Sequence, residues 1–255
     1  MIEHSVTQVW TRAFVGGAPP PPRPAWAPVA PAFRDLTPAD LARHAGGAVG
    51  ECVSGWAFDS VTAQPTRYLP WLEARAAATG VETRYGVRLA SLAELAPEFD
   101  AVINCSGLGA RELSADRALT PVRGQVVRVA APWVQRALFV DEVTYIIPNA
   151  DWVVLGGSAT SGDERTEVDA DETADIVSRC SAALPSLTTA LVLGAWAGLR
   201  PVRSPVRVER GESLSRARGA RPTAVVHCVG HGGSGVTLHW GCAGDAVALV
   251  VEALG

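Results

Sequence analysis

Residues 226–242 constrain the fold of this chain more than any other part of its sequence. They begin as an apolar strand, pass through a glycine-rich turn and end as the start of a capped helix, and residues 226–237 spell VHCVGHGGSGVT. The four glycines of the turn let a ligand approach the backbone where a Cβ would collide. The N–H groups at the start of the helix favour negative charge. The sequence therefore predicts a strand–turn–helix unit whose backbone faces an electron-rich ligand.

The bulk properties exclude several classes of protein. A chain of 255 residues that is 48% hydrophobic can bury a sizeable core in one large domain or two small ones. A net charge of −4 gives no reason to expect nucleic acid or an anionic membrane surface as a partner. We also expect no membrane span, because no apolar stretch reaches the roughly 18 to 20 uncharged residues that a span requires.

Five cysteines are scattered without C-x-x-C or histidine–cysteine metal spacing. An odd and patternless set is typical of reduced, buried thiols, so we expect no metal site. The first residues lack the basic and apolar regions of a signal peptide. Together these features predict a cytoplasmic protein.

The chain changes character along its length. Residues 1–32 are rich in glycine and proline from residue 16 onwards, so we expect a proline-rich irregular segment there. Thr37, Pro38 and Asp40 have the spacing of a capped helix start. A second helix is expected from Thr66 to Gly80, followed by a short extended run near residues 83–89.

The remaining patterns alternate between strands and helices. We expect strands at 100–107, 122–129 and 194–209, a hairpin of 145–148 with 152–157, and a helix from 169 to 184. The order of strands and helices in the first part is typical of a parallel, doubly wound sheet, and that in the middle is typical of an antiparallel sheet. The predicted fold class is mixed α/β. We assign 33–121 and 206–255 to one domain and 122–205 to an inserted antiparallel domain.

Seven ordered blocks resemble the D-amino acid oxidase family of FAD-dependent oxidoreductases. They run from about residue 33 to the end of the chain. The blocks are 33–41, 67–72 (RYLPWL), 102–110 (VINCSGLGA), 121–125 (PVRGQ), 145–148 (YIIP), 198–203 (GLRPVR) and the glycine-rich turn. The resemblance implies a Rossmann-like FAD-binding domain with an inserted substrate-binding domain.

The chemistry implied by this family is oxidation of a D-amino acid. A hydride passes from Cα to FAD, O2 reoxidises the flavin to give hydrogen peroxide, and the imino acid hydrolyses to a 2-oxo acid and ammonia. The expected partners are therefore a small D-amino acid and O2, and a homodimer is possible. Amine oxidation of this kind needs no strong protein base, so the histidines at 227, 231 and 239 are expected to be structural.

Three residues are candidates for substrate binding. Arg200, in the GLRPVR block, resembles the arginine with which the family binds the substrate carboxylate, and a guanidinium can do so through two parallel hydrogen bonds. Tyr145 resembles a tyrosine whose hydroxyl helps to hold the same carboxylate. In the same pattern the carbonyl oxygen of Gly233 accepts a hydrogen bond from the substrate amine.

The candidate flavin contacts lie mainly in the glycine-rich turn. The family places this backbone near the flavin ring, with the helix start favouring negative charge at the N1–C2=O edge. Ser106 resembles a contact at the end of its strand, and Leu89 a contact made through its backbone. The expected flavin-binding residues of the turn are Gly232, Gly233, Ser234, Gly235, Val236 and Thr237.

One departure from the family concerns the beginning of the chain. Family members open with a strand, a Gly-x-Gly-x-x-Gly turn and a helix that seat the FAD pyrophosphate, whereas here Gly16 and Gly17 run into proline. We therefore expect a sheet that is incomplete at its N-terminus and weak FAD binding. The leading hypothesis is an oxidase for which Met1 is an internal methionine of a longer chain. The alternatives are a non-catalytic remnant of the family and a related glycine oxidase or D-aspartate oxidase.

Overall fold

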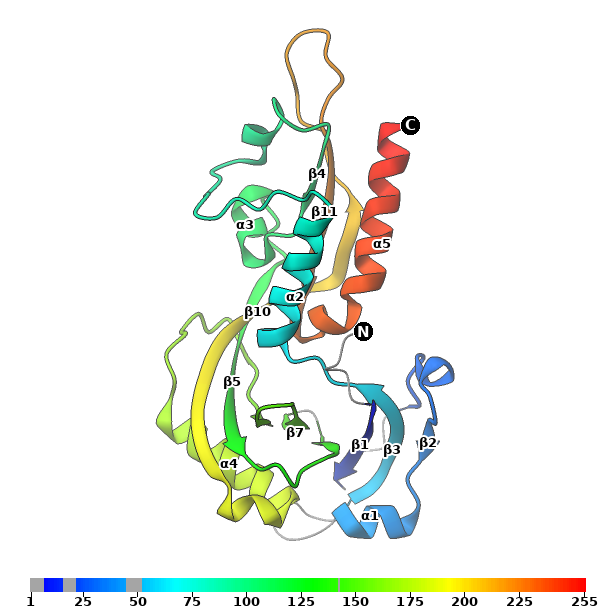
Figure 1. Ribbon diagram of the computed structural model, residues 1–255, viewed down its shortest axis with the longest axis vertical. Helices are drawn as coiled ribbons and strands as arrows, with labels where there is room; N and C mark the ends of the chain where they lie inside the picture. Colours follow the sequence, from blue (N-terminus) through cyan, green and yellow to red (C-terminus); the bar gives the residue numbers. More distant parts are fainter. Residues whose placement is uncertain (1–6, 16–21, 45–51, 142) are drawn as a thin grey trace. The chain divides into compact units, whose positions relative to one another are not determined.

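The computed structural model describes residues 7–15, 22–44, 52–141 and 143–255. Its chain forms two compact units, each made of three segments. The first unit comprises Met1–Val81, Gly124–Ala159 and Thr166–Gly198, and the second comprises Glu82–Arg123, Thr160–Arg165 and Leu199–Gly255. Two long strands, β5 (Thr120–Ala130) and β10 (Leu191–Arg210), each pass from one unit into the other (Figure 1). The predicted mixed α/β class is confirmed.

The first unit is built on a mixed sheet. Its strands follow the order β2-β3-β1-β6-β7-β8-β5, in which β1 pairs with β6 in parallel and its other pairings are antiparallel. The predicted hairpin is confirmed, since β7 and β8 pair Tyr145 with Gly156. The strands are β1 (Thr7–Val15), β2 (Arg34–Asp35), β3 (Cys52–Val61), β6 (Ala137–Val140), β7 (Thr144–Pro148) and β8 (Val153–Gly156).

Local signals set the helices of this unit. In α1 (Pro38–His44) the Thr37 hydroxyl accepts from the Asp40 N–H at 3.2 Å, and the Asp40 carboxylate accepts from the Thr37 N–H at 3.1 Å. This is the reciprocal cap that the sequence predicted. The expected second helix is α2 (Pro65–Ala78), and Gly80 follows it in the left-handed region with φ +88°. Short 3-10 turns, η1 (Ala27–Val29) and η5 (Pro185–Thr189), complete the unit.

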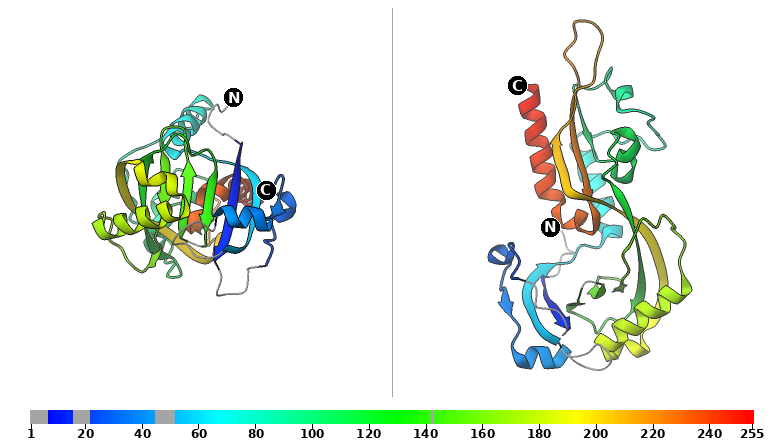
Figure 2. Two further views of the ribbon diagram at one scale, coloured as in Figure 1. Left: turned by 90° about the horizontal axis from the view of Figure 1, so that it is seen from below. Right: turned by 180° about the vertical axis from the view of Figure 1, so that it is seen from behind.

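The core of the first unit lies between α4 (Ala170–Ala183) and the sheet. Asp169 caps this helix by accepting from two backbone N–H groups of its first turn. The buried residues of α4 are Ile176, Cys180 and Ala183, whose spacing of four and three places them on one face. That face packs on β7 and β8 (Figure 2). Alternate residues of β5, among them Val127 and Val129, fill the same core.

The second unit contains the expected strand–turn–helix. Strand β11 (Ala224–His231) is followed by the 3-10 turn η6 (Gly232–Ser234) and by α5 (Gly235–Leu254), which runs beside β11 (Figure 1). The strand order is β10-β11-β4, with β10 antiparallel and β4 parallel to β11. The other elements are η3 (Leu92–Leu95), β4 (Ala101–Asn104), η4 (Gly107–Gly109), α3 (Ala110–Leu113) and β9 (Thr160–Ser161), which pairs with β5.

Helix α5 presents much apolar surface to solvent. Ala246 is its buried residue, whereas Trp240 is 67% exposed and Val251 is 63% exposed. With the turn before it, residues 232–254 are long and apolar enough to cross a membrane by length and composition alone. This stretch contains Asp245 and Glu252, so it is not an uncharged run, and the expectation of no membrane span stays a prediction.

The expectation of an irregular segment over residues 1–32 is wrong for part of its length. Thr7–Val15 forms β1, which pairs with both β3 and β6. The segment TQVWTRAFV is rich in β-branched and aromatic residues and precedes the first proline, so it favours a strand. Residues 22–32 are tied to β3, because the Asp59 N–H donates to the Pro31 carbonyl at 2.8 Å. The Gly16-Gly17 pair lies outside the described residues.

Two further expectations differ from the structure. Residues 83–89 form neither strand nor helix and are mostly exposed, with Tyr85 and Val87 among the exposed apolar side chains. The predicted domain boundaries also differ from the compact units, since the chain up to Val81 joins the unit that contains most of 122–205. The assignment of these units to FAD and substrate binding remains a prediction.

Candidate functional site

The glycine-rich turn packs on strand β10. A Cβ built on Gly230 would stand 2.5 Å from Arg203 Cβ, and one built on Gly232 would stand 3.0 Å from Val202 Cγ2. Both glycines have positive φ, +94° and +55°, which side chains disfavour. Glycine is therefore required at both positions by close approach and by backbone conformation.

The start of α5 has no side-chain cap. Ser234 is the N-cap residue, but its side chain makes no capping hydrogen bond, so the expectation of a capped start is wrong in this respect. Gly233, Ser234, Val236 and Thr237 are exposed, and Gly232 and Gly235 are half-buried. The first turn of a helix carries a partial positive charge. The turn can therefore donate hydrogen bonds to a partly negative group.

Arg200 lies beside this turn. A Cβ built on Gly233 would stand 3.6 Å from Arg200 Cδ and 3.8 Å from Arg200 Nε. Arg200 is half-buried on β10, two residues before Val202, whose side chain lies against Gly232. The structure thus brings the expected carboxylate-binding arginine and the expected amine-binding carbonyl to one place, although their roles remain predictions.

Ser106 reaches the same end of the second unit. It follows β4, and because β4 and β11 are parallel, their carboxyl ends meet at one edge of the sheet. The next residue, Gly107, lies near Pro201 of β10, with 3.8 Å between an added Cβ and Pro201 Cγ. We call Ser106, Arg200, Gly232 and Gly233 the site cluster. Leu89 is half-buried in the irregular segment before η3, and its place in a site remains a prediction.

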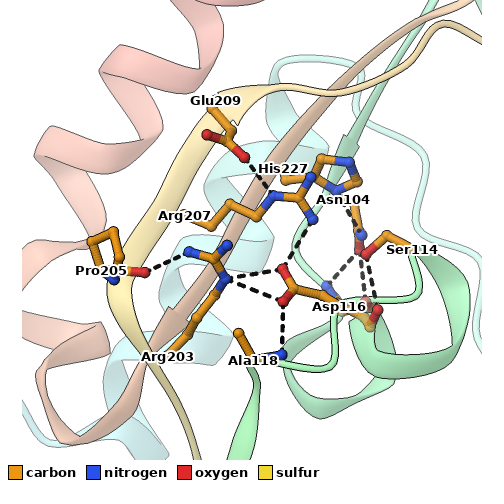
Figure 3. Close-up of polar contacts among 11 residues, drawn as sticks. Asn104, Ser114, Asp116, Ala118, Arg203, Pro205, Arg207, Glu209 and His227 are labelled. Carbon is orange, nitrogen blue, oxygen red and sulfur yellow. Dashed lines mark hydrogen bonds and ion pairs between the residues drawn. The ribbon is translucent and has the colours of Figure 1, made fainter.

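A buried ion network lies next to the site cluster and was not predicted. Asp116, whose side chain is 5% exposed, accepts from Arg203 Nε at 3.0 Å and from Arg207 Nη1 at 2.9 Å (Figure 3). Burial alone would raise the pKa of Asp116, but Arg203, Arg207 and the Ala118 N–H together hold it below its usual range. Arg203 and Arg207 therefore have a structural role.

Tyr145 belongs to the first unit, where glycines leave room for its ring. A Cβ on Gly156 would stand 1.9 Å from Tyr145 Cζ, and one on Gly157 would stand 2.6 Å from the hydroxyl oxygen. From the other face of the sheet, Arg179 donates to the Thr144 hydroxyl at 2.8 Å and to the Gly157 carbonyl at 3.0 Å. Arg179 thus ties β7, which carries Tyr145, to the end of β8, whose glycines face the ring. The position of the Tyr145 ring is therefore well defined.

The cysteines do not all match the expected buried thiols. Cys180 is buried, and burial raises the pKa of its thiol to about 11, whereas Cys105 is exposed. Cys228 and Cys242 are half-buried, and the thiols of these four cysteines form no disulfide. In the part of the chain that the structure describes, no group of three histidine, cysteine or acidic side chains could hold a metal ion.

Comparison with known proteins identifies the family of this chain. The family model described as FAD dependent oxidoreductase (DAO) matches residues 23–249. D-aspartate oxidase from Homo sapiens is 42% identical over 232 residues, which are 90% of this chain and 65% of that protein. D-amino-acid oxidase from Rubrobacter xylanophilus is 43% identical over 209 residues, 80% of this chain and 61% of that protein. The chain thus spans less than two thirds of either relative.

Solved structures share the fold. Glycine oxidase from Geobacillus kaustophilus superposes with a TM-score of 0.75 at 20% identity, over 97% of this chain and 72% of that one. The family match covers all four residues of the site cluster. The chain belongs to the DAO family of FAD-dependent oxidoreductases.

Proposed function

We propose that this chain carries the flavin-ring side and the carboxylate-binding side of an FAD-dependent oxidase of D-amino acids. The products would be a 2-oxo acid, ammonia and hydrogen peroxide. One observation carries the proposal: Arg200 lies beside Gly233, at the start of a long helix whose first N–H groups have no side-chain cap. Arg200 could bind a carboxylate, and the backbone of the neighbouring glycine-rich turn could contact an electron-rich ring.

The site cluster fits an FAD ring. Gly232 and Gly233 leave the turn without side chains, and the N-terminus of α5 follows at once. A planar ring can approach such a surface closely, and the helix start stabilises negative charge on the ring edge. When bound, FAD supplies the hydride acceptor that no side chain of the protein can provide.

The residues of the chain would orient the substrate. Arg200 binds the α-carboxylate through two hydrogen bonds, which fixes both its position and its rotation. The Gly233 carbonyl oxygen accepts from the amine, so the two ends of the substrate are held by neighbouring groups. A role for the Tyr145 hydroxyl in holding the carboxylate stays a prediction, because Tyr145 belongs to the first unit. No residue is assigned as a base, since the amine reacts as its free base.

The relatives support an amino acid oxidase and leave the subtype to experiment. The named relatives act, by their names, on D-aspartate and D-amino acids, and the structural neighbour is a glycine oxidase. The second candidate is a non-catalytic member of the family. It is favoured by one observation: the described ranges hold two strand–glycine turn–helix units, 101–113 and 224–254, and both already contribute residues to the site cluster at the flavin-ring end of FAD. We accordingly expect the 255-residue chain to bind FAD weakly.

A peroxide assay with added FAD tests the proposal. The purified chain should produce hydrogen peroxide from D-alanine and not from L-alanine, and parallel reactions with D-aspartate and glycine define the subtype. Absence of peroxide at saturating FAD with every substrate would favour the non-catalytic alternative. A chain that is purified with its flavin absorbance already present would contradict weak FAD binding. A cytoplasmic location, a homodimer and the absence of membrane association remain proposals.

A further inference from the structure

Asn104 ends strand β4 with its side chain buried beneath the site cluster. It is 3% exposed. Its Oδ1 accepts from the Ser106 N–H at 3.2 Å and from the Ser106 hydroxyl at 2.6 Å. Its Nδ2 lies 3.1 Å from Nδ1 of His227 on the neighbouring strand (Figure 3). One amide group therefore links His227 to Ser106.

The donors of this chain of hydrogen bonds fix its direction. Both Ser106 groups donate to Asn104, so the oxygen of the amide must face Ser106 and its NH2 group must face His227. Nδ1 of His227 must then be an acceptor, which requires a neutral ring with its proton on Nε2. A proton on Nδ1 would place its N–H donor opposite the NH2 donor of Asn104, and no hydrogen bond could form.

The surroundings of His227 favour the neutral ring. The side chain is 4% exposed, and a Cβ on Gly211 would stand 2.4 Å from its Nε2. The charged groups that act on it are Arg207 and Glu209 of β10, and Asp116. Burial lowers the pKa of His227 most and Arg207 lowers it further, while Glu209 and Asp116 oppose this without reversing it.

We propose that His227 and Asn104 are positioning residues that hold Ser106 in place, and that protonation of His227 releases Ser106. In the protonated ring both nitrogens are donors, so the Asn104 amide would have to turn and present NH2 to the Ser106 N–H. Ser106 would then lose both hydrogen bonds to Oδ1. The consequence for FAD rests on the proposed function, in which Ser106 is a flavin contact.

NMR of the uniformly ¹⁵N-labelled chain tests the positioning role without any cofactor. At pH 7.5 the ¹⁵N shifts of His227 should show the Nε2–H tautomer. Between pH 7.5 and 5 the His227 ring, the Asn104 side-chain amide and the Ser106 backbone amide should titrate together with one midpoint below 6.5. In H227Q, whose amide oxygen can still accept from Asn104, the Ser106 signal should be independent of pH. In H227L it should be displaced at every pH.

The matched control is H239Q, because His239 lies on α5 and its ring bonds the Val236 carbonyl of the same helix. It should leave the Ser106 titration unchanged. An Nδ1–H tautomer, or a Ser106 signal that is unmoved in H227L, overturns the positioning role. If His227 stays neutral down to pH 5, or if the Ser106 signal does not change as His227 titrates, the proposed release of Ser106 by protonation is overturned.

FAD titrations at pH 8.0 and 5.5 then separate this inference from the proposed function. Loss of one net hydrogen bond should weaken FAD binding about 5-fold at the lower pH in the wild-type chain and not in H227Q. S106A should bind with the weaker affinity at both values. If no form binds FAD, the proposed function fails, while the NMR result still decides whether His227 and Asn104 position Ser106.

Discussion

The side chain of Arg203 lies so close to Gly230 that a Cβ on the glycine would stand 2.5 Å from Arg203 Cβ. Arg203 is anchored in turn by Asp116, at 3.0 Å from its Nε. The glycine-rich turn therefore rests on the strand that carries Arg200, three residues away. This close packing of the turn on β10, at the Cβ and Cα of Arg203, holds the turn next to Arg200.

Replacing Gly230 should disturb this packing strongly. In G230A the new methyl group meets Arg203, and the residue must also keep φ at +94°. Strain of these two kinds costs about 2 kcal/mol or more of unfolding free energy, measured by urea unfolding. The control is G241A on α5, where an added Cβ meets nothing within 4 Å and alanine favours the helix. Equal stability of the two variants would contradict the close approach.

Removing the charge of Asp116 should destabilise the second unit. In D116N the shape is retained, but Arg203 and Arg207 lose their shared carboxylate while their side chains stay only 20% and 16% exposed. Breaking a buried pair in this way costs about 3 to 5 kcal/mol. D35N is the matched control, because the Asp35–Arg23 pair is exposed on both sides and should contribute far less. Similar losses in urea unfolding would show that the Asp116 network is not a stabilising one.

The elements that the sequence predicts well are those set by neighbouring residues. Thr37 and Asp40 cap α1, and Asp169 caps α4, within a few positions of the groups that they bind. The hairpin at Tyr145 likewise follows from alternation and a short turn. Strand β1 was missed although Thr7–Val15 is rich in β-branched and aromatic residues, because the proline-rich stretch after it led us to assign all of residues 1–32 to one irregular segment.

The site shows a different limit. The family resemblance made Arg200, Gly233 and Ser106 candidates before their contacts were known. Nothing in the sequence links Asn104 to His227, which are 123 positions apart, or Asp116 to Arg203, which are 87 apart. Such polar pairs depend on which strands become neighbours, so they appear only once the sheet order is known.

Arg200 should be essential for substrate affinity if the proposed function is correct. In R200L the two charge-assisted hydrogen bonds to the carboxylate are lost, which should raise KM for D-alanine roughly 100-fold, measured by peroxide release with saturating FAD. R210L is the control, since Arg210 is an exposed residue near the end of β10. An unchanged KM in R200L, or an equal rise in R210L, would remove Arg200 from the site.

His227 should make the stability of the chain depend on pH in a defined window. Its folded pKa lies below the unperturbed value of 6.5, chiefly because the ring is buried. At a pH between the folded and the unfolded pKa of His227, the unfolded chain binds a proton that the folded chain does not. The free energy of unfolding therefore falls as the pH drops below 6.5, and His227 does not affect it above that pH. The slope cannot exceed about 1.4 kcal/mol per pH unit for one proton. Urea unfolding from pH 5 to 8 should show this fall in the wild-type chain and not in H227Q, whose side chain does not titrate.

Asp116 contributes at more acidic pH and does not disturb this window. Its pKa in the folded chain is lowered, so its stabilising contribution is lost only when the pH falls below the usual titration range of a carboxylate. A wild-type profile that stays parallel to that of H227Q between pH 5 and 6.5 would show that His227 is not held neutral by the fold.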